Sequence, residues 1–326
     1  MKKPNHQSTA KWMAAAAAAA VCTGAVAADA YPDKPVRMIV GFAPGGGTDT
    51  TARPIAQKLG ELLGVQVIVD NRPGAGGNIA TDIVAKSNPD GYTILMGTIA
   101  ALAINPSLYS KLPFDPDKDL APVIQAVDST NILSVHPSVP AGSVKELITL
   151  AKSKSLSYGS SGVGGTGHLA GELFNVMAGT QLVHVPYKGG GPAMIDLVAG
   201  QVQAVFATGA SAVPQIKNGK IKGLAVTTIK RSALMPELPT IAESGLKGYD
   251  ANNWYGVMVP AKTPRAVINR LNAETTKVLN MPDVKSFLFN QGLDAAPGTP
   301  EAFGAYIKAE RVKWAKVIKA AGAKAE

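Results

Sequence analysis

The sequence has almost no cysteine, few charged residues and no long apolar run. Its only cysteine among 326 residues is Cys22, near the amino terminus. The rest of the chain therefore cannot form a disulfide, a cysteine-ligated zinc site or a thiol nucleophile. Charged residues make up 17% and apolar residues 46%, a balance that excludes a disordered chain. Beyond residue 30 no apolar stretch reaches the roughly 18 residues of a membrane span, so we expect none there.

The charge of the chain is positive but dispersed. Lys and Arg number 32 against 23 Asp and Glu, a formal net charge of +9, yet basic residues never cluster in a longer run than a pair. Nucleic-acid-binding proteins usually gather their basic residues on one face or in one segment. We therefore expect no nucleic-acid partner, and a surface that attracts small anions or acidic partners.

The first 30 residues have the pattern of a secretory signal peptide. Three lysines precede or begin the apolar run Met13–Val21, which is mostly alanine and too short for a membrane span. Ala25–Ala27 and Ala28–Ala30 both place small residues as signal cleavage sites do. Cys22 follows Val21 rather than a small residue, which argues against a lipoprotein signal. We predict cleavage near residues 27–30 and an exported, soluble, periplasmic protein.

Two stretches of the chain alternate short apolar strands with amphipathic helices. The first begins at residue 31, with strands expected at 36–40, 65–70 and 92–96. The second begins near residue 131, with strands expected at 131–136, 156–160, 182–185, 202–207 and 224–227. Such alternation predicts an α/β fold with mostly parallel sheets covered on both faces. Helix starts are indicated by Thr48 or Asp49, by the capping box Ser143–Glu146 and by Thr299.

The carboxy-terminal segment has one strand pattern, at 254–259, followed by helices. This is too little sheet to stand alone, so we predict that the segment returns to pack on the first lobe. The chain would then cross twice between two lobes, near 128–136 and 246–256. We predict lobe 1 as residues 31–130 plus 252–326 and lobe 2 as residues 131–251. Two such lobes form a cleft that can close around a ligand.

The glycine-rich segment Gly162–Gly167 matches G-x-G-x-x-G between a strand and a helix. A dinucleotide site also needs an acid at the end of the next strand, and Pro186-Tyr187-Lys188 stands there instead. A P-loop needs Lys and Ser or Thr where His168-Leu169 stands. We therefore expect no nucleotide cofactor. The remaining alternatives are an anion-binding loop at a helix N-terminus and a tight turn without a ligand.

Hydrolysis is a second hypothesis, because Ser160, Ser161 and His168 lie close together in the sequence. The nucleophile elbow G-x-S-x-G fails at its last position, where Val163 stands. His136 and His184 lie in strand patterns, and no two histidines have the spacing of a zinc pair. We predict neither a catalytic triad nor a metal site.

Four glycine-rich loops join strands to helices, two in each predicted lobe. They are Phe42–Asp49, Asn71–Asn78, Gly162–Gly167 and Val185–Pro192. Ligands of open α/β sheets bind outside the carboxyl ends of the strands, where all four loops are expected. Four helix N-termini meeting at one cleft favour a carboxylate or phosphate without requiring an arginine. Asp49 is interpreted as a cap or brace rather than a base, and Arg72 and Lys188 as solvated or ligand-facing.

Seven ordered motifs resemble those of a known family. They are Tyr31-Pro32-x-Lys34-Pro35, Phe42–Asp49, Asn71–Gly77, Tyr158–His168, His184–Gly189, Pro239–Gly245 and Val259–Pro264. Over essentially the whole mature chain they resemble the Bug-type periplasmic solute receptors of tripartite tricarboxylate transporters. The resemblance implies a two-lobe Venus-flytrap, a type II periplasmic binding protein fold with two crossover hinge strands. It also implies a non-enzymatic monomer that carries a small organic acid anion to an integral membrane permease of two subunits.

The resemblance implies a site without a metal or cofactor. In the family one carboxylate sits at the loop matching Phe42–Asp49, and the second lobe closes over it. The ligand-binding residues expected here are Phe42, Ala43, Pro44, Gly45, Gly46, Gly47, Thr48, Asp49, Gly76, Thr98, Ser160, Ser161, Gly164, Thr166, His168, Pro186, Tyr187 and Lys188. The site has no arginine clamp, so mono-, di- and tricarboxylates, aliphatic or aromatic, stay open. A sensory adaptor that presents the closed form to a membrane sensor stays open as an alternative role.

Overall fold

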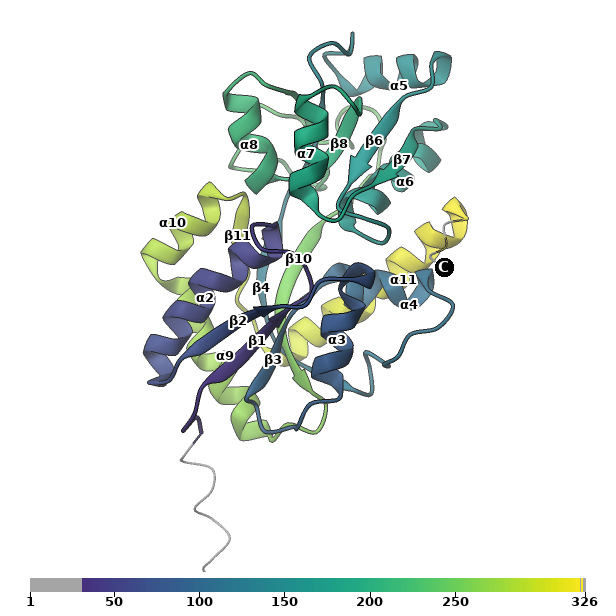
Figure 1. Cartoon of the computed structure of the whole chain (residues 1–326). Helices are drawn as coiled ribbons and strands as arrows, with labels where there is room; N and C mark the ends of the chain where they lie inside the picture. Colours follow the sequence, from purple (N-terminus) through teal and green to yellow (C-terminus); the bar gives the residue numbers. More distant parts are fainter. Residues whose placement is uncertain (1–30, 323, 325–326) are drawn as a thin grey trace, which may run out of the picture.

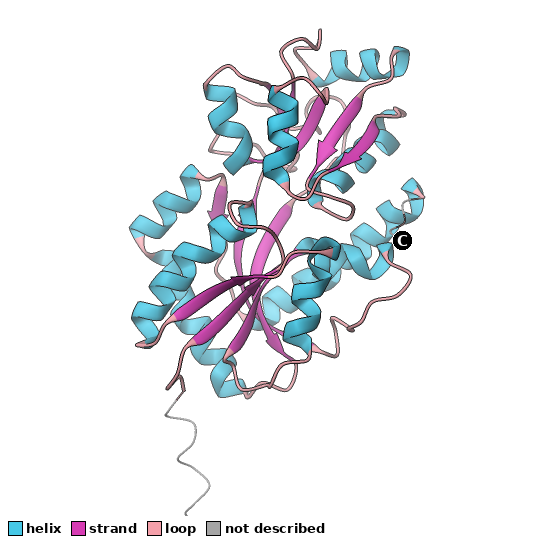
Figure 2. Ribbon diagram, viewed as in Figure 1, coloured by secondary structure: helices cyan, strands magenta, loops and turns pink. Residues whose placement is uncertain are grey.

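The computed structural model describes residues 31–322 and 324, which form two α/β lobes, one above the other (Figures 1 and 2). The predicted signal peptide and its cleavage site lie outside the described residues. Each lobe is built on one mixed sheet, and the chain passes between the sheets twice. The predicted two-lobe α/β fold with two crossovers is therefore confirmed.

The lower lobe contains a six-stranded sheet in the order β11-β4-β10-β3-β1-β2. Its strands are β1 (Val36–Val40), β2 (Val67–Asn71), β3 (Thr93–Thr98), β4 (Leu120–Ser129), β10 (Asn253–Pro260) and β11 (Leu293–Ala295). Strand β1 is parallel to β2 and β3, whereas β10 is antiparallel to both β3 and β4. The carboxy-terminal segment thus returns into the first sheet, as predicted, through its strand β10.

Helices cover both faces of this sheet because its strands are apolar on both faces. Val36, Met38 and Val40 of β1 pack into a core with α2 (Gly47–Leu63), α9 (Arg265–Asn280) and α10 (Pro282–Asn290). Ile39, which points to the opposite face, packs into a second core with α3 (Asn78–Ala85) and α11 (Pro300–Ala321). The period of two along β1 therefore assigns its side chains to the two layers.

The upper lobe contains a five-stranded sheet in the order β7-β6-β8-β5-β9. Its elements are β5 (Asn131–Val135), α5 (Val144–Ser153), β6 (Ser157–Ser160), α6 (Thr166–Ala178), β7 (Val183–Pro186), α7 (Gly190–Val198), β8 (Ala204–Thr208), α8 (Gly209–Lys217) and β9 (Lys222–Val226). Strands β7, β6 and β8 are parallel, so the helices that follow them start at the same edge of the sheet. That edge faces the lower lobe (Figure 1).

Most strands of each sheet run in one direction, as predicted, but both sheets are mixed rather than purely parallel. Strand β5 is antiparallel to β8 and β9, and β10 is antiparallel to both of its neighbours. The sequence analysis also missed β4, which is ten residues long and carries Pro122. Proline cannot donate to a strand ladder, and Pro122 sits beside an irregularity in the pairing of β4 with β10. Strand β11 has only three residues, too few for a periodic signal.

The crossovers lie close together at the junction of the lobes. Thr130 alone separates β4 of the lower sheet from β5 of the upper sheet. The second crossover leads from β9 to β10. On its way the Ala251 amide donates to the Thr227 carbonyl, and the Thr227 hydroxyl donates to the Ala251 carbonyl. Within residues 31–322, no helix is both long and apolar enough to cross a membrane.

Candidate functional site

A cavity of about 370 Å³ lies between the two lobes. The lower lobe contributes the β1–α2 loop, the end of β3 and the start of β10, and the upper lobe contributes the ends of β6 and β8 and the loop before α7. From the predicted set, the lining contains Phe42, Ala43, Pro44, Gly45, Gly46, Gly47, Thr48, Thr98, Ser160, Ser161, Thr166 and Lys188. Three of the four predicted glycine-rich loops thus contribute to one space, the β1–α2 loop from the lower lobe and the loops after β6 and β7 from the upper lobe.

The β1–α2 loop presents the N-terminus of α2 to this cavity. Helix α2 begins at Gly47 and has Gly46 as its N-cap, without a side chain to cap its first amides. The first amides of a helix have no intrahelical acceptor and carry the positive end of its dipole. The N-cap therefore lies two residues before Thr48 and three before Asp49, the two predicted alternatives. It leaves backbone N–H groups at the cavity wall for an anion.

Gly47 is also the point where three parts of the molecule come together. A Cβ placed on Gly47 would lie 2.8 Å from the hydroxyl of Tyr255 and 3.5 Å from Cγ2 of Thr208 in the upper lobe. A side chain at this position would push either the phenol or the other lobe away. Gly47 was expected as part of a ligand-binding loop, and the packing gives a further reason for a glycine at this position.

Asp49 braces this loop from below and is not in the cavity lining. Its carboxylate is buried and accepts hydrogen bonds from the Gly45 amide (3.0 Å), from Arg53 (2.8 and 2.9 Å) and from Asn71 (2.9 Å). Burial alone would raise the pKa of Asp49, but these hydrogen bonds and the Arg53 charge together lower it below its usual range. The carboxylate is therefore charged at neutral pH and fixes the turn at Gly45.

We expect Asp49→Ala to lower the free energy of unfolding by about 2 kcal/mol. The change leaves the Gly45 amide without an acceptor and removes one of the two acceptors of Asn71 Nδ2, which keeps the Phe42 carbonyl. The Arg53 side chain, which is half exposed, regains water. We also expect weaker ligand binding, because the turn at Gly45 loses its anchor. Urea unfolding measures the first effect. The matched control is Glu61→Ala, which breaks an exposed pair with Lys58 on the same helix and should cost under about 1 kcal/mol. Equal losses in both variants would contradict the bracing role.

The upper lobe presents three more helix N-termini to the cavity. Helix α6 starts at Thr166 with Gly165 as its N-cap, and α7 starts at Gly190 with Gly189 as its N-cap. Helix α8 starts at Gly209 after Thr208, and both Thr208 and Ser211 line the cavity. The sequence analysis predicted the first two and missed the third. Its only local signal was Thr208-Gly209 after an apolar strand.

Lys188 is the only charged side chain in the cavity lining formed by the described residues. It is exposed and lies at the start of the loop before α7. The other polar lining side chains are neutral: Thr48, Thr98, Asn131, Ser160, Ser161, Thr166, Thr208, Ser211, Asn253 and Tyr255. The lining formed by the described residues thus contains one cation, four positive helix ends and no acidic side chain. This arrangement favours an anionic ligand.

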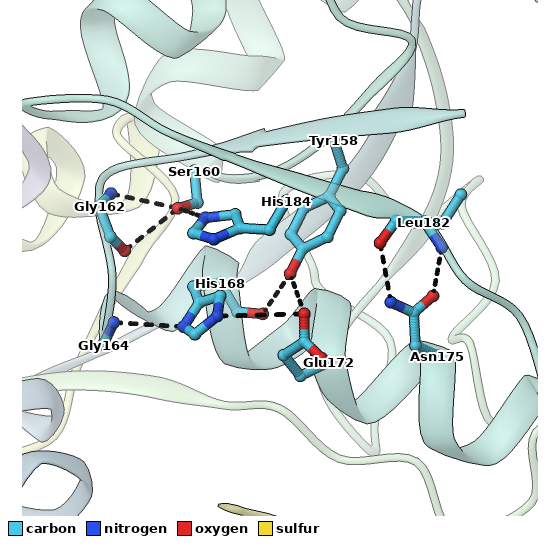
Figure 3. A network of polar contacts seen from close by, with 9 residues as sticks. All are labelled: Tyr158, Ser160, Gly162, Gly164, His168, Glu172, Asn175, Leu182 and His184. Carbon is cyan, nitrogen blue, oxygen red and sulfur yellow. Dashed lines mark hydrogen bonds and ion pairs between the residues drawn. The ribbon is translucent and has the colours of Figure 1, made fainter. Parts of the chain in front are cut away.

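A pair of histidines supports the glycine loop after β6 (Figure 3). Nε2 of His184 lies 2.6 Å from Oγ of Ser160, and Nδ1 of His168 accepts the Gly164 amide at 3.2 Å. The two rings stack with centroids 4.1 Å apart. Burial lowers the pKa of His168 to about 4, and burial together with the His168 ring lowers the pKa of His184 to about 3. A base with a pKa near 3 is too weak to activate Ser160 at neutral pH, so this contact supports a structural role.

Six predicted site residues lie outside the cavity lining. Asp49 braces the β1–α2 loop, His168 supports the β6–α6 loop, and Pro186 ends β7. The hydroxyl of Tyr187 donates to Asp196 at 2.7 Å, so its side chain is turned onto α7. Gly76 and Gly164 lie where the two lobes touch each other. The loop Asn71–Asn78, predicted as one of four ligand loops, is absent from the lining.

Three lining residues next to the crossovers were not singled out as binding residues by the sequence analysis. Asn131 follows the first crossover, and Asn253 and Tyr255 follow the second. Nδ2 of Asn253 donates to the Tyr255 hydroxyl at 3.1 Å. Tyr255 belongs to both the cavity wall and the core, because its ring packs in the core beside α2 while its hydroxyl meets Gly47.

The sequence and the fold both have known counterparts. Residues 51–323 match the family model described as "Tripartite tricarboxylate transporter family receptor". Protein BugT of Bordetella pertussis is 37% identical over 92% of this chain and 93% of its own length. A Rhodopseudomonas palustris protein solved with adipate is 39% identical, with a TM-score of 0.86 over 90% of this chain and 98% of that one. MatC from the same species, solved with malate, is 30% identical, with a TM-score of 0.83 over 88% and 100% of the chains.

Proposed function

Because the chain belongs to the receptor family of tripartite tricarboxylate transporters, we propose that it binds a small carboxylate in the cavity between its lobes. The observation that carries this proposal is the convergence of four helix N-termini and Lys188 on a cavity to which the described part of the chain contributes no acidic side chain. Relatives solved with adipate and with malate support the same ligand class.

The proposed binding uses hydrogen bonds rather than an arginine clamp. One carboxylate accepts amide hydrogen bonds at the N-terminus of α2, near Gly46 and Gly47, and the upper lobe adds Ser160, Ser161 and Thr166. Hydrogen bonds to a charged group are worth about 1.5–3 kcal/mol each. Three or four of them reach the roughly 8 kcal/mol of a micromolar complex, after part is lost to ordering.

Closure of the lobes is the proposed mechanical step. We propose residues 31–130 with 252–326 as one lobe and 131–251 as the other, moving about the paired crossovers at Thr130 and Ala251. The ligand stabilises the closed form only through contacts that the open form lacks. The receptor would act as a periplasmic monomer, and the closed form would deliver the anion to a two-subunit membrane permease.

The proposal is tested by a ligand screen on protein that has been unfolded and refolded to remove any ligand from the host. The panel holds mono-, di- and tricarboxylates, aromatic acids, amino acids, neutral sugars and nucleotides, at fixed pH. We expect a dose-dependent rise in Tm with one class of carboxylate, followed by a single-site isotherm. A response to sugars or nucleotides alone would contradict the proposal.

We expect Lys188→Gln to weaken binding of the identified anion about fivefold at low ionic strength. Lys188 is exposed, so its attraction at contact distance is worth about 1 kcal/mol in water. Added salt screens such a charge, and the difference should nearly vanish at about 1 M salt. Calorimetry at two salt concentrations measures this, with Lys152→Gln on α5 as the control for a distant exposed lysine. A loss that salt does not reduce would assign Lys188 a direct, desolvated contact instead.

A further inference from the structure

The two lobes touch outside the cavity, along the loop that joins β6 to α6. A Cβ placed on Gly164 of this loop would lie 2.7 Å from Oδ1 of Asn105 and 3.0 Å from Cδ2 of Leu108, both in the lower lobe. A Cβ placed on Gly76 would lie 3.5 Å from the carbonyl oxygen of Val163. We call these five residues, Gly76, Asn105, Leu108, Val163 and Gly164, the glycine seam. The lobes approach this closely only because positions 76 and 164 carry no side chain.

Asn105 is a rigid wall on the lower side of the seam. It is fully buried, and its Nδ2 donates to Oδ1 of Asn78 at 2.7 Å and to the Gly76 carbonyl at 3.2 Å. These two hydrogen bonds fix the carboxamide, so Oδ1 is the atom that the Gly164 position meets. Within the described residues this oxygen has no hydrogen-bond partner. A side chain at position 164 would therefore meet a group that cannot turn aside without breaking both bonds.

The seam loop also reaches the ligand cavity. Ser160, Ser161 and Thr166, at the two ends of the loop, line the cavity, while Gly164 in its middle meets Asn105. The loop is stiffened by the Gly164 amide bonded to His168 and by the Gly165 amide bonded to the Gly162 carbonyl at 3.1 Å. A stiff loop cannot keep its cavity contacts in place while its middle is pushed off the lower lobe. Cavity closure and seam contact are thus mechanically linked.

We propose that Asn105 and Gly164 are positioning residues for ligand binding, which set affinity through the fit of the seam and not through contact with the ligand. This inference rests on the proposed carboxylate binding, because the affinity for the carboxylate is used to measure how completely the lobes close. A ligand that binds the closed form loses apparent affinity in proportion to the population of that form. Bulk at position 164 is then expected to raise Kd although no residue of the cavity lining is substituted.

The first test compares two glycine variants with the same backbone cost. Gly164 has φ +78° and Gly248 has φ +85°, and a Cβ on Gly248 would meet no heavy atom within 4 Å. Both Gly164→Ala and Gly248→Ala place alanine in the left-handed region, but only the first obstructs the seam. We expect Gly164→Ala to raise Kd for the carboxylate found in the screen at least tenfold, mainly through faster dissociation. Gly248→Ala should bind as the wild type does. Equal affinities in the two variants would overturn the proposal.

Two further measurements distinguish an effect of the glycine seam from a loss of folding and from a failure of the proposed carboxylate binding. In the Gly164→Ala background, Asn105→Ala removes the obstructing oxygen and should restore part of the lost affinity. If the losses of affinity in the two single variants simply added in the double variant, the proposed contact between positions 164 and 105 would be overturned. Small-angle scattering of the ligand-free proteins should give a larger radius of gyration for Gly164→Ala than for Gly248→Ala. If the wild type binds no carboxylate, the proposed function fails, and scattering alone decides the seam, with equal radii overturning it.

Discussion

Replacing Gly46 by Asp is expected to weaken carboxylate binding at least 100-fold while leaving the fold intact. Gly46 is the N-cap of α2 and has φ −80° and ψ 167°, which any residue can adopt. A Cβ there would come no closer than 3.5 Å to a neighbour, the Ala43 carbonyl. Aspartate is a preferred N-cap, so its carboxylate would accept the first amides of the helix itself. It would thereby occupy the place of the ligand with the charge of the ligand.

The size of this effect follows from the bonds that are lost. One or two charge-assisted hydrogen bonds amount to about 3 kcal/mol, which corresponds to more than 100-fold in Kd. Calorimetry with the identified ligand measures the affinity, and urea unfolding checks that stability is unchanged or raised. Gly46→Ala is the control for bulk and Gly46→Asn for bulk with capping but no charge. If Gly46→Asp bound the ligand as well as these two variants, the N-terminus of α2 would not be the carboxylate site.

The glycine loops were the most predictable part of the site. A strand followed by glycines and a helix pattern places backbone amides at one sheet edge, whatever the side chains are. That reasoning located Phe42–Thr48 and the ends of the Ser160–Thr166 loop, which line the cavity. The sequence also predicted Ser143 and Thr299 as N-caps, and both side chains accept a backbone amide there. These features are local, because each depends on residues close together in the chain.

The sequence analysis failed where the outcome depends on how the lobes face each other. The loop Asn71–Asn78 has the same glycine pattern as the ligand loops, yet its Gly76 lies in the seam beside Asn105. No local pattern distinguishes a glycine that admits a ligand from one that admits another lobe. The start of α8 at Thr208 lines the cavity without any glycine run before it. The antiparallel direction of β10 was not predicted for a related reason, because β10 joins its sheet from more than 120 residues away along the chain.

The histidine pair and Asp49 show how the two loops are held in different ways. In the lower lobe a buried, charged carboxylate gathers the donors of the β1–α2 loop. In the upper lobe two uncharged imidazoles accept from or contact the β6–α6 loop (Figure 3). A carboxylate in this role fails when it is protonated at low pH. An imidazole can no longer accept a hydrogen bond in this role once it is protonated. The unfolded chain takes up that proton at a higher pH than the folded protein does.

The protein is accordingly expected to lose stability steadily as the pH falls from about 6.5 to 4. An ordinary histidine has a pKa near 6.5, whereas burial lowers the pKa of His168 to about 4 and that of His184 to about 3. In this window the unfolded chain binds more protons than the folded one, so the free energy of unfolding falls with pH. The slope approaches about 1.4 kcal/mol per pH unit for each histidine that stays neutral, and less for His184, which is partly exposed.

Substitution at His184 isolates this contribution from other groups that titrate. Glu172 lies 4.0 Å from His168 and could partly offset its charge, while burial raises the pKa values of Asp128 and Asp294 and opposes the slope. His184→Phe keeps a ring in the stack but cannot bind a proton. We expect its free energy of unfolding, measured in urea at several pH values, to fall less steeply than that of the wild type between pH 6.5 and 4. Identical slopes would mean that His184 is already protonated in the folded protein, and the 2.6 Å contact with Ser160 would then be a charged one.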